Sequence, residues 1–425
     1  MSTERLDVLP LTAPVDADIA VPGSKSYTNR ALVCAALARG TSTLTGPLVS
    51  EDTAAMLDCL AALGIGVQSD EAGSWLVDGC DGRIPNSSAD LACRLSGTTA
   101  RFITPVACLG EGPYRITGEP SLLARPMAGQ FSALRALGSL IASERVPNHL
   151  PVQVRRGTFR GGSVQVPGNA SSQFLSGLLL AAPCYPEGID VEVTTDLVSR
   201  SYVDLTLDTI DSFGGRVVRA DGVHFQVEYG GYLARRYEVE PDASAASYFF
   251  AAAAVTGGRI RVNSLHRSSR QGDVGFLDIL TQMGCTVSDN GKGLEVTGPA
   301  KLHGVTVDMQ NCSDVAQTLA AIAPFADGPT RITGIGFIRR KETDRIAAMV
   351  NELQRCGIHA IEEADGVLIQ PGEPQPASIH TYDDHRMAMS FALVGLRVPG
   401  ISILDPGCVA KTFPRFWDTL DTLRN

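Results

Sequence analysis

The sequence feature that most limits the fold is a pattern that recurs about every 70 residues. Six times, a cluster of small polar or charged residues leads into an apolar segment that is closed by a glycine. Polar residues favour helix starts, glycine favours helix ends, and an apolar run between them is typical of a buried helix. The closing glycines Gly40, Gly110, Gly188, Gly257, Gly328 and Gly400 are 70, 78, 69, 71 and 72 residues apart.

A second helix, this time amphipathic, recurs at the same interval. It is predicted over Asp52–Leu63, Gln130–Leu137, Leu205–Phe213, Phe276–Met283 and Asp344–Cys356, with Phe416–Leu420 as a sixth copy. Short β-rich stretches such as Gly215–Val218 follow these helices. The period exceeds that of most solenoid repeats, so the pattern predicts six small α/β units rather than an elongated rod. A chain of 425 residues accommodates them as two domains of three units.

The boundary between the two domains is expected where a short extended run meets a proline. Such runs occur at Ile19–Gly23 and Tyr237–Asp242. If residues 1–22 supplied a strand to the C-terminal half, the N-terminal half would be inserted into it. We therefore predict a discontinuous domain of residues 1–22 and 241–425 and an inserted domain of residues 23–240, each with three repeats.

Composition excludes several classes of protein. The net charge of −10 argues against a general nucleic-acid surface, which needs a basic face. No apolar run approaches membrane-spanning length and residues 1–5 do not resemble a signal peptide, so a cytoplasmic protein that binds neither membrane nor nucleic acid is expected. The ten cysteines form no C-x-x-C pair. They are predicted to be buried, reduced side chains rather than disulfides or zinc ligands.

The starts of the six buried helices predict an anion site. Each start presents unpaired backbone N–H groups and the positive end of the helix dipole. If the two domains aim these starts at one another, all six line one cleft. Arginine suits bidentate contacts with carboxylate or phosphate, and lysine acts as a point charge. Small, multiply anionic substrates are therefore expected. The cations near these starts are Lys25, Arg30, Arg101, Arg125, Arg345, Arg386 and Lys411.

Several of these clusters also have ordinary structural interpretations. Pro22–Arg30 could be a simple helix cap with solvated cations. It is not a P-loop, because the residue before Lys25 is Ser24 and no glycine stands five residues before that serine. Lys341–Arg345 could be a first-turn salt-bridge face. Asp384 and His385 could be a cap beside a structural histidine or half of a metal site, but no second ligand is suitably spaced, so no metal is predicted.

Several motifs, in order along nearly the whole chain, resemble the enolpyruvyl transferase family. They are PGSKSYTNRA at 22–31, GEPSLLARPM at 118–127, SSQFLSGLLL at 171–180, DLVSRSYVDLTL at 196–207, DASAASYFFAAAA at 242–254, RRKETDR at 339–345, YDDHRMAM at 382–389 and AKTF at 410–413. The resemblance implies an inverse α/β barrel-like pair of domains, each with three βαβαββ units, and a cleft that closes on ligand.

The resemblance also implies a reaction. The enolpyruvyl group of phosphoenolpyruvate would pass to the 5-hydroxyl of shikimate 3-phosphate with release of phosphate, in the shikimate pathway of aromatic amino-acid biosynthesis. The hydroxyl attacks C2 while the methylene C3 is protonated, which requires a base and an acid but no metal or organic cofactor. Asp314 is predicted as the base, and Glu342, His385 and Lys25 are candidates for proton delivery to C3. The enzyme is expected to act as a monomer on these two small molecules.

Binding residues are carried over from the same motifs. Shikimate 3-phosphate is expected to contact Lys25, Ser26, Arg30, Ser171, Ser172, Gln173, Ser199, Tyr202, Asp314 and Lys341. Phosphoenolpyruvate is expected to contact Lys25, Gly97, Arg125, Gln173, Arg345, Arg386 and Lys411.

Two departures and two alternatives accompany this resemblance. Residues 95–102 read LSGTTARF where the family usually has NAGTAMRP, and Phe337 stands where asparagine is common. The first concerns the phosphoenolpyruvate pocket and the second a contact with shikimate 3-phosphate. The related transferase that acts on UDP-N-acetylglucosamine is one alternative, although its signature lacks this GSKSYTNR start. A catalytically inactive anion-binding protein is the other, although binding alone does not require carboxylates among the cations.

Overall fold

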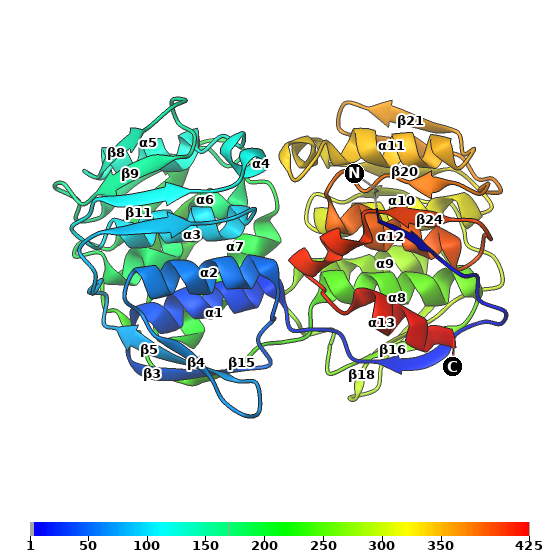
Figure 1. The fold of residues 1–425 in the computed structure, drawn as a ribbon, viewed down its shortest axis with the longest axis horizontal. Helices are drawn as coiled ribbons and strands as arrows, with labels where there is room; N and C mark the ends of the chain where they lie inside the picture. Colours follow the sequence, from blue (N-terminus) through cyan, green and yellow to red (C-terminus); the bar gives the residue numbers. More distant parts are fainter. Residues whose placement is uncertain (1–3, 170, 425) are drawn as a thin grey trace. The chain divides into compact units, whose positions relative to one another are not determined.

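The computed structural model describes residues 4–169 and 171–424, and its internal contacts divide the chain into two compact units. The inserted unit consists of residues 23–239 (Figure 1). The discontinuous unit consists of residues 1–22 and 240–425. Residues 1–3, 170 and 425, which belong to the predicted domains and to one predicted helix start, lie outside the described residues.

The inserted unit contains three sheets built on one plan, in which a parallel strand pair is extended by an antiparallel hairpin. The strand orders are β14-β3-β5-β4 with β15 also on β3, then β6-β7-β9-β8, then β10-β11-β13-β12. The strands are β3 Ala38–Thr45, β4 Val67–Ser69, β5 Trp75–Cys80, β6 Ala89–Ala92, β7 Tyr114–Thr117, β8 Leu140–Ser143, β9 Val152–Arg155, β10 Gly162–Val166, β11 Ile189–Val193, β12 Val217–Ala220, β13 His224–Val227, β14 Tyr232–Leu233 and β15 Arg236–Glu238. The helices are α1 Lys25–Leu37, α2 Glu51–Ala62, α3 Gly97–Ala107, α4 Pro120–Leu123, α5 Ala128–Ala136, α6 Ser172–Ala181 and α7 Arg200–Ser212.

Two of the three sheets in the discontinuous unit repeat this plan, and the third has three strands, with β23 parallel and β1 antiparallel to β24. The strand orders in this unit are β17-β18-β16-β2, β19-β20-β22-β21 and β1-β24-β23. The strands are β1 Arg5–Asp7, β2 Asp16–Ile19, β16 Arg259–Asn263, β17 Thr286–Asp289, β18 Gly293–Thr297, β19 Thr306–Asp308, β20 Thr330–Thr333, β21 Ala360–Glu363, β22 Gly366–Ile369, β23 Ser378–Ile379 and β24 Ser402–Leu404. The helices are α8 Ala243–Thr256, α9 Phe276–Gln282, α10 Ala316–Ile322, α11 Arg345–Arg355, α12 His385–Gly395 and α13 Phe416–Asp421. These six small sheets with their helices confirm the predicted two-domain α/β fold of six repeats.

Three sheets receive a strand from a distant part of the sequence, and one of these strands is β1, which lies antiparallel to β24. β2 lies parallel to β16, with Asp16 opposite Arg259, and Figure 1 shows it as the blue strand beside β16. β14 and β15 lie parallel to β3, with Tyr232 opposite Ala38. Each unit therefore completes its own sheets. The chain enters the inserted unit after β2 and leaves it after β15.

The buried helices form the centre of each unit. α1, α3 and α6 contact one another in the inserted unit, and α8, α10 and α12 do so in the discontinuous unit. Every residue of α1 from Tyr27 to Leu37 is buried. Alanine and other small side chains let such helices approach closely. The amphipathic helices pack beside them, which is why their apolar residues occupy one face only.

Helix ends differ from the prediction more than helix positions do. The first buried helix was expected to reach Gly40, but it ends at Leu37 and β3 begins at once with Ala38. Gly40 lies inside β3 with a φ of 98°. By contrast, Gly257 caps α8 in the left-handed conformation, as predicted for a closing glycine. Among the described residues, no helix has both the length and the apolar character that crossing a membrane requires.

Candidate functional site

Most of the predicted site residues lie near the amino-terminal ends of helices, and they form two groups that belong to different units. In the inserted unit, Lys25, Ser26 and Arg30 lie on α1, Gly97 begins α3, Arg125 follows α4, Ser171, Ser172 and Gln173 start α6, and Ser199 and Tyr202 start α7. In the discontinuous unit, Asp314 lies in the 3₁₀ helix Ser313–Val315, Lys341 and Glu342 follow the 3₁₀ helix Gly336–Arg340, Arg345 starts α11, His385 and Arg386 start α12, and Lys411 ends the 3₁₀ helix Pro406–Lys411.

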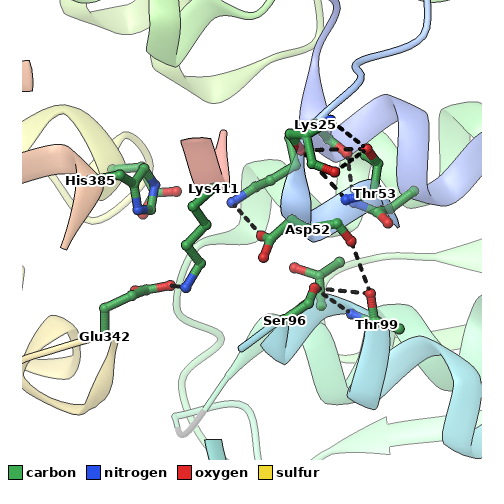
Figure 2. Close-up of polar contacts among 12 residues, drawn as sticks. Lys25, Asp52, Thr53, Ser96, Thr99, Glu342, His385 and Lys411 are labelled. Atoms are coloured by element: carbon green, nitrogen blue, oxygen red, sulfur yellow. Dashed lines mark hydrogen bonds and ion pairs between the residues drawn. The ribbon is translucent and has the colours of Figure 1, made fainter. Parts of the chain in front are cut away.

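Lys25 extends from the first turn of α1. Ser24 caps this helix, its Oγ accepting a hydrogen bond from the Tyr27 N–H at 3.4 Å. The Lys25 Nζ lies 3.4 Å from Asp52 Oδ2, and the two side chains are 15% and 5% exposed (Figure 2). The backbone oxygen of Asp52 accepts from the Thr99 hydroxyl at 3.3 Å. The start of α2 therefore connects Lys25 to the start of α3.

Two guanidinium groups flank Gly97. A Cβ atom added at this glycine would lie 2.8 Å from Arg101 Nη1 and 2.9 Å from Arg125 Nη1. Arg101 Nη1 donates to Gln173 Oε1 at 2.7 Å, and Gln173 Nε2 donates to Thr98 Oγ1 at 3.1 Å. Both arginines are 8% exposed. The start of α3 thus gathers two cations and backbone N–H groups, which is a composition suited to a carboxylate or phosphate.

Arg30 has a structural role, which the sequence did not predict. Its side chain is 2% exposed, and burial lowers the pKa of the guanidinium to about 10. Nε donates to Thr206 Oγ1 at 2.8 Å. Nη1 donates to the backbone carbonyl oxygen of Ser26 at 2.9 Å, and Nη2 donates to the backbone carbonyl oxygen of Tyr202 at 2.8 Å. These bonds hold α7 against α1. A contact between Arg30 and substrate stays a prediction.

The hydroxyl-bearing residues divide between capping and strained backbone. Ser171 caps α6, its Oγ accepting from the Gln173 N–H at 3.3 Å. Ser199 directly precedes α7 and makes no side-chain capping bond; its φ of 53° is a left-handed conformation that is unusual for serine, and it is 3% exposed. Such strain persists only where the surrounding structure fixes it, and it concentrates at functional sites.

Arg345 organises the group in the discontinuous unit. Its Nε lies 2.8 Å from Asp384 Oδ2, its Nη1 3.1 Å from Asp314 Oδ1 and its Nη2 2.9 Å from Glu342 Oε2. The side chain is 2% exposed. Burial alone would lower the pKa of this guanidinium, but the three carboxylates outweigh burial and raise it above its ordinary value. One arginine therefore fixes both predicted acid–base carboxylates.

Three further cations contact the same carboxylates. Arg386 Nη2 lies 2.6 Å from Asp314 Oδ2, and Lys341 Nζ lies 3.8 Å from Asp314 Oδ1. Lys411 Nζ lies 3.1 Å from Glu342 Oε1, and Figure 2 shows the two side chains pointing toward one another. The ring of Phe337, one of the departures from the family pattern, has its centroid 6.0 Å from Lys341 Nζ. That distance permits a cation–π contact where asparagine is usual.

The turn before α12 positions Asp384 and His385. Asp384 is fully buried, and its Oδ1 accepts from the Arg386 N–H at 2.9 Å as the helix cap. The two preceding residues, Tyr382 and Asp383, have φ values of 56° and 55°. His385 is 1% exposed, with Nδ1 3.6 Å from Asp384 Oδ1. The strained turn thus delivers Asp384 to Arg345.

A buried glutamate on α11 holds this turn. Glu352 has no exposed surface, and its carboxylate accepts from the Tyr382 hydroxyl at 2.7 Å and from the His380 N–H at 3.0 Å. It also accepts from Arg355 Nε at 2.9 Å. α11 therefore supplies Arg345 at one end and, further along, the residue that supports the turn carrying Asp384.

Sequence reasoning missed the partners of the predicted residues. Asp52 was included only as the start of an amphipathic helix, although it contacts Lys25. One usable signal was the scarcity of lysine, because only five occur in the chain and three of them, Lys25, Lys341 and Lys411, are predicted site residues. Within residues 4–169 and 171–424, no cluster of three or more His, Cys, Asp or Glu side chains is arranged to hold a metal ion.

Comparisons with known proteins agree with this geometry. The family profile of EPSP synthase (3-phosphoshikimate 1-carboxyvinyltransferase) matches residues 11–420. The chain is 47% identical over 416 residues to the 3-phosphoshikimate 1-carboxyvinyltransferase of Nostoc punctiforme, covering 97% of this chain and 98% of that one. It is 48% identical over 409 residues to the enzyme of the same name from Trichormus variabilis, covering 96% of each.

Solved structures give the same result. A structure of EPSP synthase from Acinetobacter baumannii superimposes with a TM-score of 0.83 at 28% identity, covering 99% of this chain and 98% of that one. The family profile matches nearly the whole chain, the relatives are almost half identical to it, and the solved structure shares its fold. The same chain carries Arg345 with its three carboxylate partners. The chain therefore belongs to the EPSP synthase (3-phosphoshikimate 1-carboxyvinyltransferase) family.

Proposed function

We propose that this chain transfers the enolpyruvyl group of phosphoenolpyruvate to the 5-hydroxyl of shikimate 3-phosphate, and that the two groups of residues at the helix starts carry out the reaction. Both substrates are small and multiply anionic, which suits a set of cations held in a chain of net charge −10. We also propose that the chain acts as a cytoplasmic monomer without nucleic acid or membrane. Residues 1–22 with 241–425 and residues 23–240 would be its two domains.

Asp314 is the proposed base for the 5-hydroxyl. In the free protein its carboxylate contacts Arg345, Arg386 and Lys341, and cations at such distances keep a carboxylate ionised and weakly basic. An anionic substrate that binds these cations weakens their pull on Asp314. Its affinity for a proton should therefore increase when the substrate is in place.

Proton delivery to C3 of phosphoenolpyruvate is assigned to Glu342, His385 or Lys25. Glu342 contacts Arg345 and Lys411, which favour its ionised form, so its carboxyl group would have to take up a proton before it could deliver one to C3. The phosphate and carboxylate of the tetrahedral intermediate would bind the remaining cations. Electrostatic contacts aimed at developing charge supply much of the catalysis in such reactions.

Ligand contacts are proposed for the same residues as the family motifs indicate. For phosphoenolpyruvate they are Lys25, Gly97, Arg125, Gln173, Arg345, Arg386 and Lys411. For shikimate 3-phosphate they are Lys25, Ser26, Arg30, Ser171, Ser172, Gln173, Ser199, Tyr202, Asp314 and Lys341.

This proposal depends chiefly on the ion pairs of Asp314 and Glu342 with Arg345. The variant Asp314→Asn tests it. Phosphate release would be measured with both substrates present and with each one omitted. General-base catalysis typically contributes about 10²–10⁴-fold, so the variant should lose at least about a hundredfold in turnover. Asp418→Asn is the control, because that side chain is 73% exposed. Turnover of Asp314→Asn equal to that of the control would remove Asp314 from the chemistry.

A further inference from the structure

Asp273 is a buried carboxylate that neither the motifs nor the proposed chemistry uses. It lies in the 3₁₀ helix Gly272–Gly275 and is 5% exposed. Its Oδ2 accepts a hydrogen bond from the hydroxyl of Ser244, near the start of α8. The Ser244 Oγ in turn lies 3.5 Å from Arg386 Nη2, and that same nitrogen lies 2.6 Å from Asp314 Oδ2. A chain of polar contacts therefore runs from Asp273 to the proposed base.

Ser244 links the two charged groups through its two hydrogen-bonding functions. A hydroxyl donates one hydrogen bond and accepts others through its lone pairs. When Asp273 is ionised it can only accept, so the Ser244 hydrogen points toward it and the Ser244 oxygen remains available to Arg386. An ionised Asp273 thus favours the orientation in which Ser244 and Asp314 both accept from the Arg386 guanidinium.

The surroundings of Asp273 place its titration near neutrality. Burial and the negative charge of Asp314 raise its pKa to about 7, whereas Arg386 and the Ser244 hydroxyl lower it. Asp242, which caps α8, also raises it. Burial raises the pKa of the neighbouring Cys312 thiol to about 12, so this thiol stays neutral. On the adjacent helix α9, Asp278 is 67% exposed and pairs with Arg267 at 2.8 Å.

We propose that Asp273 is a positioning residue for the transfer reaction, acting through Ser244 on Arg386 and strengthening Asp314 as a base when Asp273 is ionised. The ionised carboxylate of Asp273 is a second negative charge near Asp314, and it increases the affinity of Asp314 for a proton. Through the Ser244 oxygen, the ionised Asp273 also draws on the positive charge of Arg386, so that less of this charge acts on Asp314. This inference rests on the proposed role of Asp314 as the base.

The test compares turnover of the wild type and Asp273→Asn as a function of pH. Asparagine keeps the shape and can still accept from Ser244, but it cannot ionise. Below the pKa of Asp273 both proteins are neutral at this position, and above it only the wild type is charged. The ratio of wild-type to variant kcat should therefore rise by roughly three- to tenfold between about pH 5.5 and about pH 9. Ionisation of other groups occurs in both proteins and largely cancels in the ratio.

Two further variants separate this role from a loss of packing. Ser244→Ala removes a bond that lowers the pKa of Asp273, so the rise in activity should move to higher pH. Asp278→Asn, on the neighbouring helix, should match the wild type at every pH. A wild-type to Asp273→Asn ratio that does not change with pH, or a Ser244→Ala profile identical to that of the wild type, would overturn the proposal.

The same experiments distinguish failure of this inference from failure of the proposed site. If Asp314→Asn is inactive but the Asp273→Asn ratio is flat, only the positioning role is wrong. If Asp314→Asn retains full turnover, Asp314 is not the base and Asp273 has no base to strengthen.

Discussion

Arg345 lies within 3.1 Å of carboxylate oxygens from Asp314, Glu342 and Asp384. A buried charge without partners is costly, and a buried pair is tolerated only where its hydrogen-bonding groups are satisfied. Here the planar fork of arginine reaches three separate carboxylates, which a lysine ammonium cannot do with the same geometry. The pairing explains how an acidic chain keeps two acid–base carboxylates and four cations in one compact group.

Gly97 offers a direct test of the phosphoenolpyruvate assignment. A Cβ atom there would press on the guanidinium ends of Arg101 and Arg125. Those ends can move, so Gly97→Ala should alter ligand binding more than folding. Overpacking of about 1–3 kcal/mol corresponds to at least about a fivefold increase in KM for phosphoenolpyruvate.

The control for Gly97→Ala lies in the same unit. Gly230 has open space around the position of its Cβ, so Gly230→Ala should leave both Michaelis constants unchanged. An unchanged KM for phosphoenolpyruvate in Gly97→Ala, measured beside this control, would separate Gly97 from the binding site.

The functional part of a residue was predictable from the sequence where the residue belongs to a motif. It was not predictable where contacts with distant parts of the chain determine that part. Lys25, Asp314 and Arg345 stand in local patterns of small polar and charged residues. Arg30 stands in such a pattern too, yet its guanidinium is buried against α7, which lies about 170 residues further along the chain. Asp273 shows the opposite case, because nothing around it in sequence signals that it approaches Arg386 through Ser244.

At the scale of elements, α11 and the turn before α12 act together. Glu352 on α11 accepts from Tyr382 and His380 in the turn, and Arg345 at the start of α11 binds Asp384 at its end. Left-handed backbone at both Tyr382 and Asp383 costs energy, which these contacts offset.

Glu352→Gln should destabilise the protein. Three donors now meet the two carboxylate oxygens, and the amide would replace one of these oxygens with a donor, so at least one buried bond is lost. A lost bond to a charged group costs about 1.5–3 kcal/mol in the free energy of unfolding, measured by urea denaturation. Glu362→Gln is the control because that side chain is 45% exposed. Equal unfolding free energies for the two variants would show that Glu352 does not hold the turn.

Elements were predicted well in position because hydrophobic periodicity is a local signal. The amphipathic helices Phe276–Gln282 and Arg345–Arg355 each end one residue before the predicted end. The end of α1 was missed because Ala38 and Arg39 carry no helix-stop signal. They leave the helix because β3 pairs on one edge with β5 and on the other with β14 and β15. Those partners lie far away in sequence, where periodicity gives no information.

At the scale of the whole molecule, the chain places its two sets of functional groups in separate compact units. Lys25, Arg125 and Gln173 belong to the inserted unit, while Asp314 and Arg345 belong to the discontinuous one. The six repeats were visible in the sequence because each carries its own helix pattern. The pairing of β2 with β16 was visible only as a possibility, since strand pairing over some 240 residues leaves no local trace, and the pairing of β14 with β3 was not predicted.

The central claim is that the inserted unit and the discontinuous unit both serve one enolpyruvyl transfer, and Lys25→Ala tests it most directly. Lys25 is the single lysine between residues 23 and 239, and it belongs to the unit that lacks Asp314. Phosphate release with both substrates would be compared with that of Lys292→Ala, and thermal unfolding would be recorded for each. Turnover of Lys25→Ala should fall by more than about tenfold, because a charge-assisted contact to a substrate anion contributes about 1.5–3 kcal/mol, and its unfolding curve should not change. Turnover of Lys25→Ala equal to that of Lys292→Ala would contradict a role of the inserted unit, through Lys25, in the enolpyruvyl transfer.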